Sequence, residues 1–293
     1  MILVTGSDGI VGREICKKLQ ESAISFLPAT HRRKPHTLSQ ALPVDLARDL
    51  DSLEGYLPKI TAIIHLAAAV PHSVSYPDNE VSADYTRRMD RNICDLQSKL
   101  GVPVIYMSTC GLYDRSAVDI KHEDDQSQVF IKSPYFATKA DGEKMFLSGG
   151  VSTVLRLAAP IGAGIKPQLV LSRFIATARG SGVIKIWGDG TREQDFIDTA
   201  DVADLILRIL DQPKTMVLNV ASGVPTSMLK LAEIVVSTIG AGSIVKATQS
   251  DPRDGETARY SIERAKEYYK WSPASTLAHS IANMALEDFE ANT

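Results

Sequence analysis

The chain has 293 residues, a formal net charge of −3 at pH 7, and an ordinary composition in which 44% of residues are hydrophobic and 23% charged. This length can bury a large core, in one large α/β domain or in two. The small net charge provides no field that would attract nucleic acid or an anionic membrane. The longest apolar runs, such as residues 62–70, are too short to cross a bilayer and are interrupted by His65.

The cysteines and histidines point to a reducing compartment and to a protein without a metal. Cys16, Cys94 and Cys110 are odd in number and scattered, with no Cys-x-x-Cys pair, so we interpret them as reduced thiols in the cytoplasm. The six histidines form no ligand cluster, and we expect no metal site. Because an apolar strand begins at residue 2, we also expect no signal peptide before it.

The first dozen residues predict a strand, a glycine turn and a helix. Residues 2–4 are apolar, glycines follow at Gly6, Gly9 and Gly12, and apolar positions then recur every four residues. In such a loop one glycine forms the tight turn, one lets backbone amides approach a pyrophosphate, and one lets the helix pack close to the strand. The helix N-terminus then faces the phosphates. The segment therefore predicts a dinucleotide site, although its spacing differs from the commonest Gly-x-Gly-x-x-Gly fingerprint.

The end of the second strand, over residues 23–29, selects the cofactor. Pro28 suggests that this strand ends early or is locally an edge. A carboxylate about 20 residues beyond the glycines would hold the ribose 2′-hydroxyl of NAD, whereas an Arg would accommodate the 2′-phosphate of NADP. Thr30 stands eighteen residues after Gly12, and Arg32 and Arg33 follow shortly. These residues favour NADP over NAD as the cofactor. The alternative is that they form a solvated basic loop that binds no ligand.

Two further segments fit a nucleotide site. Asp45 follows a short apolar segment, where it could accept a hydrogen bond from an adenine amino group or cap the next helix. Residues 62–69 read as a buried strand that ends in small residues, against which a flat ligand could lie. His65 within this strand is most simply a core histidine with satisfied hydrogen bonds. Residues 81–100 show the spacing of a long amphipathic helix.

The candidate chemistry follows the next strand, residues 102–107. Ser108 and Thr109 stand at its carboxyl end, where open α/β sheets bind ligands. Tyr135 and Lys139 are four residues apart in the following predicted helix and so share one face. A phenol with a pKa near 10 needs that pKa to fall by about three units to act as a general acid/base at neutral pH. We expect the Lys139 ammonium to lower it and to hold the ribose, while Thr109 binds the substrate oxygen; the set would interconvert an alcohol and a ketone.

In this order the motifs resemble those of the extended short-chain dehydrogenases/reductases, the branch of nucleotide-sugar epimerases, dehydratases and reductases. The resemblance covers essentially the whole chain and implies that Thr109, Tyr135 and Lys139 are the catalytic residues, with Ser108 as a neighbouring substrate contact. It also implies a homodimer formed through the helices at 81–100 and 135–147. The expected dinucleotide contacts are Gly6, Asp8, Gly9, Ile10, Gly12, Thr30, Arg32, Arg33, Asp45, Leu46, Leu66, Ala67, Ala68 and Lys139.

By the same analogy the fold is a doubly wound parallel sheet of the Rossmann type with a smaller, interleaved substrate domain. We expect residues 1–157, with 195–221 returning to them, to form the dinucleotide domain, and residues 158–194 and 222–293 to form the substrate domain. Predicted elements of the second half are a strand at 151–157, helices at 169–177, 202–210, 229–239 and 262–269, and strands at 184–187 and 216–220.

The chain departs from the family at three places. Dehydratases follow the threonine with Asp and Glu, where this chain has Cys110 and Gly111, so water elimination is not expected. The usual diphosphate-binding Arg is replaced by Gln194, with Arg192 two residues earlier, while Arg253 stands where a second such Arg is often found. Asp84 lies near a position that is commonly Asn.

The leading hypothesis is an NADP-dependent oxidoreductase or epimerase acting on a hydroxyl or keto carbon of a nucleotide-linked sugar. Net reduction is slightly favoured, because NADP suits an exchanged reductant whereas family epimerases retain NAD. A carbonyl reductase of a non-nucleotide substrate is the alternative that Gln194 permits. A cofactor-binding regulator without turnover is the third reading, and the intact Tyr135 and Lys139 argue against it.

Overall fold

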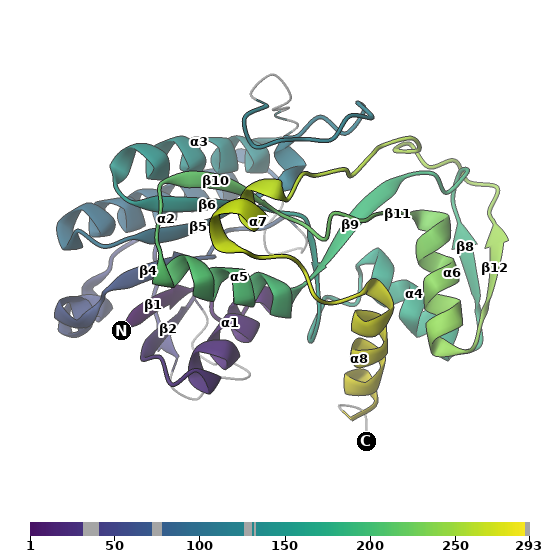
Figure 1. The fold of residues 1–293 in the computed structure, drawn as a ribbon, viewed down its shortest axis with the longest axis horizontal. Helices are drawn as coiled ribbons and strands as arrows, with labels where there is room; N and C mark the ends of the chain where they lie inside the picture. The colour runs from purple at the N-terminus through teal and green to yellow at the C-terminus, as the bar shows by residue number, and fades with distance from the viewer. Residues whose placement is uncertain (32–40, 72–77, 126–130, 132, 291–293) are drawn as a thin grey trace.

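The computed structural model describes residues 1–31, 41–71, 78–125, 131 and 133–290. Its centre is a seven-stranded parallel sheet with the strand order β10-β6-β5-β4-β1-β2-β3 (Figure 1). The order reverses between β1 and β4, so the predicted doubly wound α/β fold is confirmed. The strands are β1 (Ile2–Thr5), β2 (Phe26–Thr30), β3 (Leu42–Pro43), β4 (Ala62–His65), β5 (Val104–Thr109), β6 (Ser152–Leu157) and β10 (Met216–Val220).

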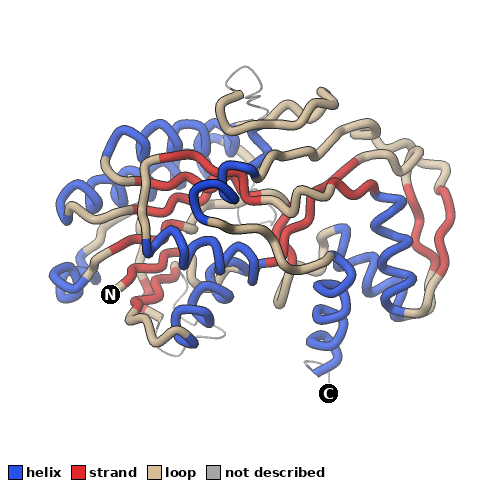
Figure 2. The backbone as a smooth tube through the Cα atoms, viewed as in Figure 1, coloured by secondary structure: helices blue, strands red, loops and turns tan. Residues whose placement is uncertain are grey.

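Helices cover both faces of this sheet (Figure 2). Successive strand residues point to opposite faces, so that Val4 and Ile64 belong to one core while Leu3 and Ile63 belong to the other. The first core is closed by α1 (Ile10–Glu21), α5 (Thr199–Asp211) and α7 (Glu263–Tyr269). The second is closed by α2 (Glu80–Leu100) and α3 (Pro134–Gly149). The 3₁₀ helix η1 (Asp51–Lys59) lies between β3 and β4 in sequence, and the 3₁₀ helix η2 (Cys110–Leu112) lies between β5 and α3.

The positions of Pro28 in β2 and of the end of β4 follow from local backbone pairing. Pro28 pairs with Val4 of β1, whereas β3 pairs only with Ala29 and Thr30 of β2, so the proline lies where β2 is locally an edge, as predicted. The apolar run at 62–69 continues past β4, which ends at His65. It ends there because the amides of Leu66 and Ala67 donate to Thr5 Oγ1, at 3.2 and 3.3 Å, in place of strand pairing.

A second group of elements forms the other part of the molecule, on the right of Figure 1. It contains a three-stranded sheet of β7 (Ala159–Ile161), β9 (Glu193–Asp198) and β11 (Pro225–Ser227), and a two-stranded sheet of β8 (Val183–Ile186) and β12 (Ser243–Lys246). These strands share a core with α4 (Val170–Arg179), α6 (Met228–Ile239) and α8 (Leu277–Glu290). Between them in sequence, α5 and β10 return to the seven-stranded sheet.

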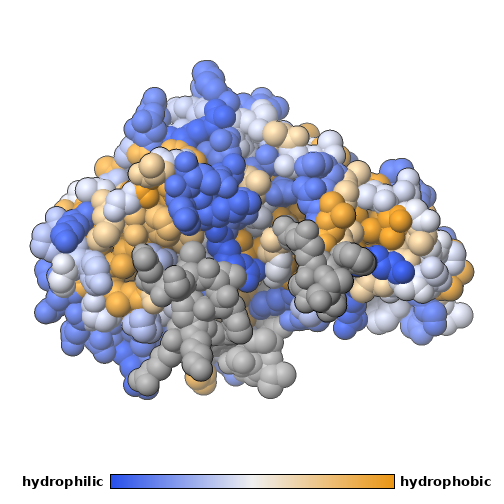
Figure 3. Space-filling model, turned by 90° about the horizontal axis from the view of Figure 1, so that it is seen from below, coloured by the Kyte–Doolittle hydropathy of each residue, from blue (hydrophilic) through white to orange (hydrophobic). Residues whose placement is uncertain are grey.

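Several of these elements were not predicted. The strands β7, β11 and β12 have three or four residues each, β9 has six, and their definition depends on tertiary pairing. Helix α8 was also missed, although its sequence indicates a helix, because Leu277, Ile281 and Met284 follow helical spacing. These three residues pack in one core. On the face shown in Figure 3, apolar residues reach the surface among hydrophilic ones on both parts of the molecule. Within the described ranges, every helix is too short or too polar to cross a membrane.

Candidate active site

The candidate site lies at the carboxyl edge of the seven-stranded sheet, where β1, β4 and β5 end side by side. Thr5 pairs with His65, and His65 pairs with Tyr106, three residues before the end of β5. The strand order reverses between β1 and β4, and doubly wound sheets bind dinucleotides in the crevice at this point. The glycine turn, the 66–68 segment and the Thr109 end of β5 are therefore brought to one edge.

The glycines after β1 are required by steric fit. Gly6 has φ of +65°, and a Cβ there would lie 2.9 Å from Ala67 N. A Cβ on Gly12 would lie only 2.3 Å from Gly6 O, which is impossible without moving backbone. Gly9 N donates to Gly6 O at 3.0 Å and closes the turn. The loop is thus folded tightly enough for its backbone to approach a ligand closely.

Helix α1 begins at Ile10 with its N-terminus unneutralised. Its N-cap residue is Gly9, no side chain caps the helix, and its first turn contains no acidic residue. Gly9 is exposed, while Asp8 and Ile10 are half-buried. The first-turn amides and the positive end of the helix dipole are therefore available to an anion. This arrangement fits the pyrophosphate of a dinucleotide, whose negative charge a helix N-terminus stabilises.

Asp45, the expected adenosine contact, is held by neighbours on both carboxylate oxygens. Its Oδ1 accepts from the Tyr85 hydroxyl at 2.6 Å and from Ala47 N at 3.2 Å, and its Oδ2 lies 3.2 Å from Arg48 Nε. The buried Thr30 ends β2 beside it, and Leu46 is buried behind it. Sequence reasoning missed Tyr85, which it saw only as a position on an amphipathic helix. The expected NADP contacts Arg32 and Arg33 lie outside the described residues.

Tyr135 and Lys139 stand in the first turns of α3, which begins at Pro134. Lys139 is buried, and its ammonium donates to the backbone oxygen of Met107 at 2.8 Å and to the Tyr106 hydroxyl at 3.4 Å. The half-buried Tyr135 donates its backbone N–H to Asp78 at 3.1 Å. Lys139 is therefore anchored to β5 two residues before Thr109, and Tyr135 lies one helical turn away on the same face.

The electrostatics of this pair differ from the expectation. Burial, and then the carboxylates of Asp90 and Asp78, raise the pKa of Tyr135 instead of lowering it. Burial lowers the pKa of Lys139, while Asp90 and Glu143 oppose that effect. The expected lowering of the phenol pKa by Lys139 was wrong for the protein alone, because burial and the carboxylates of Asp90 and Asp78 raise this pKa. The phenol is therefore kept in its protonated, proton-donating form.

The two hydroxyls at the end of β5 have different surroundings. Thr109 is half-buried, and its Oγ1 accepts from Gly111 N at 3.0 Å. Ser108 is buried, and its hydroxyl donates to Glu143, which forms a buried ion pair with Arg156 at 2.8 Å. Ser108 thus contributes to an internal network, whereas the half-buried Thr109 is the last residue of β5, at the edge of the sheet where the glycine turn lies.

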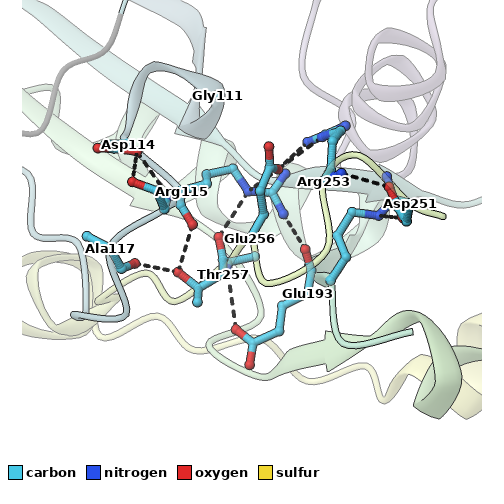
Figure 4. A network of polar contacts seen from close by, with 12 residues as sticks. Gly111, Asp114, Arg115, Ala117, Glu193, Asp251, Arg253, Glu256 and Thr257 are labelled. Atoms are coloured by element: carbon cyan, nitrogen blue, oxygen red, sulfur yellow. Dashed lines mark hydrogen bonds and ion pairs between the residues drawn. The ribbon is translucent and has the colours of Figure 1, made fainter. Parts of the chain in front are cut away.

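The candidate substrate arginines form part of a polar network between β9 and the segment that precedes α7 (Figure 4). Arg192 Nε lies 2.9 Å from Asp251, and Arg253 Nη2 lies 2.6 Å from Glu256. Gln194 is half-buried on β9. Sequence reasoning missed Arg115, which is buried in this network and donates to Thr257 O at 2.9 Å.

Three guanidinium groups therefore gather in this network. Burial lowers the pKa of Arg115, and the charges of Arg253 and Arg192 add to the effect. Their mutual repulsion is offset by the carboxylates of Asp251 and Glu256. The positive charges of these arginines are therefore balanced by carboxylates of the chain itself.

Together, the strand order and the glycine turn define a Rossmann-type α/β protein. Residues 2–221 match the model of the NAD dependent epimerase/dehydratase family. The chain belongs to this family, which confirms the resemblance found in the sequence.

The similar proteins include reductases and epimerases. The dTDP-4-dehydro-6-deoxy-D-allose reductase of Streptomyces bikiniensis is 24% identical over 93% of this chain and 91% of its own. The structure of Thermotoga maritima UDP-glucose 4-epimerase with UDP-glucose matches with a TM-score of 0.86 at 22% identity, over 100% of this chain and 99% of that chain. MoeE5 in complex with UDP-glucuronic acid and NAD matches with a TM-score of 0.81 at 22% identity, over 99% of each chain. At these identities the structural likeness establishes the fold.

Proposed function

We propose that the protein is an NAD(P)-dependent oxidoreductase or epimerase that interconverts an alcohol and a ketone on a nucleotide-linked sugar. The observation that carries this proposal is the anchoring of Lys139 to β5, with Tyr135 one turn away and Thr109 at the strand end. This trio stands at the same sheet edge as a glycine turn that fits a pyrophosphate. A regulator without turnover would need no general acid/base such as Tyr135.

Each residue has a defined role in the proposed reaction. The Tyr135 phenol gives a proton to the substrate oxygen during reduction and takes it back during oxidation. Thr109 hydrogen-bonds the same oxygen, and the Lys139 ammonium holds the ribose and stabilises negative charge on the phenol oxygen. A bound nicotinamide supplies or accepts the hydride.

Among the reactions of the family, the site favours reduction or epimerisation over water elimination. Dehydration needs additional proton-transfer groups after the threonine, where this chain has Cys110 and Gly111. Cys110 is buried and donates to Arg156 O at 3.0 Å. A Cβ at Gly111 would lie 2.4 Å from Phe136 Cε1, so the ring next to Tyr135 occupies the space that an acidic side chain would need.

The arginine network bears on the choice between a nucleotide-sugar substrate and a non-nucleotide substrate. We assign Arg192 and Arg253 to the diphosphate of a nucleotide sugar, as bidentate guanidinium contacts commonly hold phosphate. Their pairing with Asp251 and Glu256, together with Gln194 at the usual arginine position, favours the second candidate, a carbonyl reductase of a non-nucleotide substrate. The diphosphate would have to displace these carboxylates from the two arginines.

The remaining assignments follow from the same reading. NADP is the favoured cofactor, because the sequence after Thr30 contains arginines and no carboxylate. We assign residues 1–157 and 195–221 to the dinucleotide domain, and residues 158–194 and 222–293, which contribute most of the separate core, to the substrate domain. Two segments cross this division, because residues 195–198 belong to β9 in the three-stranded sheet and α7 packs in the first core. A cytoplasmic location suits the three free cysteines and a pool of reduced dinucleotide.

The deciding experiment identifies the dinucleotide that copurifies with the protein and then assays a panel of nucleotide sugars by mass spectrometry. We expect NADP(H), and a product that differs from its substrate by two hydrogens. Retained NAD with an isomeric product would instead establish epimerisation. Turnover of simple ketones in the absence of nucleotide-sugar turnover would establish the second candidate.

The role of Tyr135 is tested by Tyr135→Phe. Removal of a general acid/base typically costs 10²–10⁴-fold in rate, so we expect turnover to fall by about that factor while the dissociation constant for NADPH stays unchanged. Tyr268→Phe, which removes an exposed hydroxyl on α7, is the matched control and should keep full activity. An active Tyr135→Phe variant would remove this residue from the mechanism.

A further inference from the structure

A buried chain of hydrogen bonds runs from the cofactor strand to Lys139. The residues come from five elements: Thr5 from β1, His65 from β4, Asp90 from α2, Tyr106 from β5 and Lys139 from α3. All five side chains are buried, with at most 3% of the residue exposed. Such a network is costly unless every member is satisfied, so its hydrogen-bond pattern can be worked out group by group.

The proton count fixes the tautomer of His65. Thr5 Oγ1 accepts from the amides of Leu66 and Ala67, so both of its lone pairs are used. Its single proton is therefore donated to His65 Nδ1, 2.7 Å away. His65 then carries its own proton on Nε2 and donates it to Asp90 Oδ1 at 3.0 Å. His65 is uncharged in this arrangement and acts as a rigid donor to Asp90.

The Tyr106 hydroxyl forms a hydrogen-bonded bridge between Asp90 and Lys139. The Tyr106 hydroxyl donates to Asp90 Oδ2 at 2.9 Å, which leaves its oxygen lone pairs to accept from Lys139 Nζ at 3.4 Å. The ammonium also lies 4.7 Å from the centre of the Tyr106 ring, within range of a cation–π interaction. Two carboxylates thus contact buried donors near Lys139, Asp90 from α2 and Glu143 from its own helix.

These two carboxylates are not equivalent. Glu143 is neutralised by the bidentate Arg156 guanidinium from β6, at 2.8 and 3.0 Å. Among the described residues, the hydrogen-bond donors to Asp90 are the uncharged His65 and Tyr106, and neither of them is a cation. Tyr135, one helical turn before Lys139, is kept protonated by desolvation and by the carboxylates of Asp90 and Asp78.

We propose that Asp90, oriented by His65 and Tyr106, is the counter-ion that keeps Lys139 charged and in place at the end of β5. Asp90 is thus a positioning residue that acts through Tyr106. The inference rests on the proposed function only for the catalytic role of Lys139. The geometry of α3 supports it independently, because a Cβ on Gly142 would lie 2.1 Å from the Tyr106 hydroxyl and 2.9 Å from Asp90 Oδ2. Only glycine at this position leaves space for the bridge.

The test is an NMR titration of the protein labelled with ¹³C at lysine Cε, without substrate. The Lys139 resonance is assigned by its loss in Lys139→Met. A nearby opposite charge shifts a pKa by one to three units, so Asp90→Asn should move the Lys139 midpoint down by about one unit or more. Asp201→Asn removes another buried aspartate, on α5 across the sheet, and should leave the midpoint unchanged.

A second variant decides the matter if Asp90→Asn does not fold. Tyr106→Phe keeps the ring, which stacks on Phe146 at 4.6 Å, and removes only the bridging hydroxyl. Its Lys139 midpoint should also fall, while Tyr269→Phe, another buried tyrosine bonded through its hydroxyl, should show no change. An unmoved Lys139 midpoint in either network variant would overturn the proposal.

This titration separates the inference from the proposed function. A lowered midpoint in a protein that converts none of the nucleotide sugars or ketones would keep the Asp90 assignment and reject the proposed reaction. An unmoved Lys139 midpoint in an active enzyme would reject the Asp90 assignment and keep the proposed reaction. In an active enzyme, the pH above which kcat declines through loss of the Lys139 proton should be lower in Asp90→Asn than in the wild type.

Discussion

Gly12 packs directly against the backbone oxygen of Gly6, so closely that a Cβ on Gly12 would approach that oxygen to 2.3 Å. This contact joins the first turn of α1 to the end of β1 and forms the floor of the proposed pyrophosphate site.

Gly12→Ala should therefore disturb both folding and cofactor binding. Overpacking of this kind typically costs about 1–3 kcal/mol, which we expect in the free energy of unfolding measured with urea. NADPH binding, followed by fluorescence titration, should weaken at least tenfold because the loop amides are displaced. Gly55→Ala is the control, since a Cβ there meets nothing within 4 Å. Wild-type stability and affinity in Gly12→Ala would contradict the proposed fit.

The cofactor preference is tested at the basic segment after β2. The double substitution Arg32→Ala/Arg33→Ala should lower the preference for NADP over NAD by about tenfold or more, because the 2′-phosphate of NADP would lose its guanidinium partners. A tenfold change corresponds to about 1.4 kcal/mol of lost interaction. The measurement is the ratio of the two dissociation constants. Lys230→Ala, which removes an exposed cation on α6, should leave the ratio unchanged. An unaltered ratio in the double variant would leave the NADP assignment without support.

The raised pKa of Tyr135 predicts how the rates depend on pH. Proton donation requires the neutral phenol, which is present below its pKa, and burial extends this range upward. The initial rate of ketone reduction should therefore stay level through neutral pH, whereas the rate of alcohol oxidation should rise with pH. Both profiles can be followed by absorbance of the reduced dinucleotide. A reduction rate that falls steeply between pH 6 and 8 would mean that the phenol ionises much earlier.

Local patterns in the sequence were enough to find the glycine turn and the Tyr135–Lys139 pair. In both cases the geometry is set by residues at most a few positions apart, on a turn or on one helical face. The doubly wound parallel sheet was expected from the resemblance to the family, and the alternation of strands and helices is compatible with few other topologies.

The partners of these residues could not be read in the same way. Asp90 lies in an amphipathic helix, where a buried aspartate looks the same in sequence as a solvated one, and only the packing of α2 against β5 brings it to Tyr106. Tyr85 and Asp45 are likewise joined by a hydrogen bond across forty residues. Arg115 depends on a segment more than a hundred residues later, at Thr257.

The packing of α2 against α3 bears on the proposed homodimer. Arg87 of α2 lies 3.3 Å from Asp141 of α3, and Val81 near the start of α2 is 77% exposed. We expect a dimer by light scattering at micromolar concentration, and we expect Val81→Asp to shift it toward monomer because a charge would be buried in the interface. Val118→Asp, at another exposed valine, should not. A monomeric wild-type protein would contradict the assignment.

Asp195 on β9 links the stability of the protein to pH. Burial raises its pKa to about 6, even though the carboxylate accepts from Ser222 N and Gly223 N at 2.7 and 2.9 Å. In the unfolded chain an aspartate titrates near 3.9, so between pH 4 and 6 the folded state binds more protons than the unfolded state. This group therefore stabilises less as pH rises through that window, by about 3 kcal/mol in total.

Asp195→Asn should remove this dependence. The difference in free energy of unfolding between variant and wild type, measured with urea from pH 4 to 7, should move in favour of the variant as pH rises and level off above pH 6. Asp211→Asn, at an exposed position that ends α5, should give a flat difference over the same range. A flat difference for Asp195→Asn as well would show that its carboxylate ionises alike in the folded and unfolded chain, because only a proton bound unequally by the two states makes stability depend on pH.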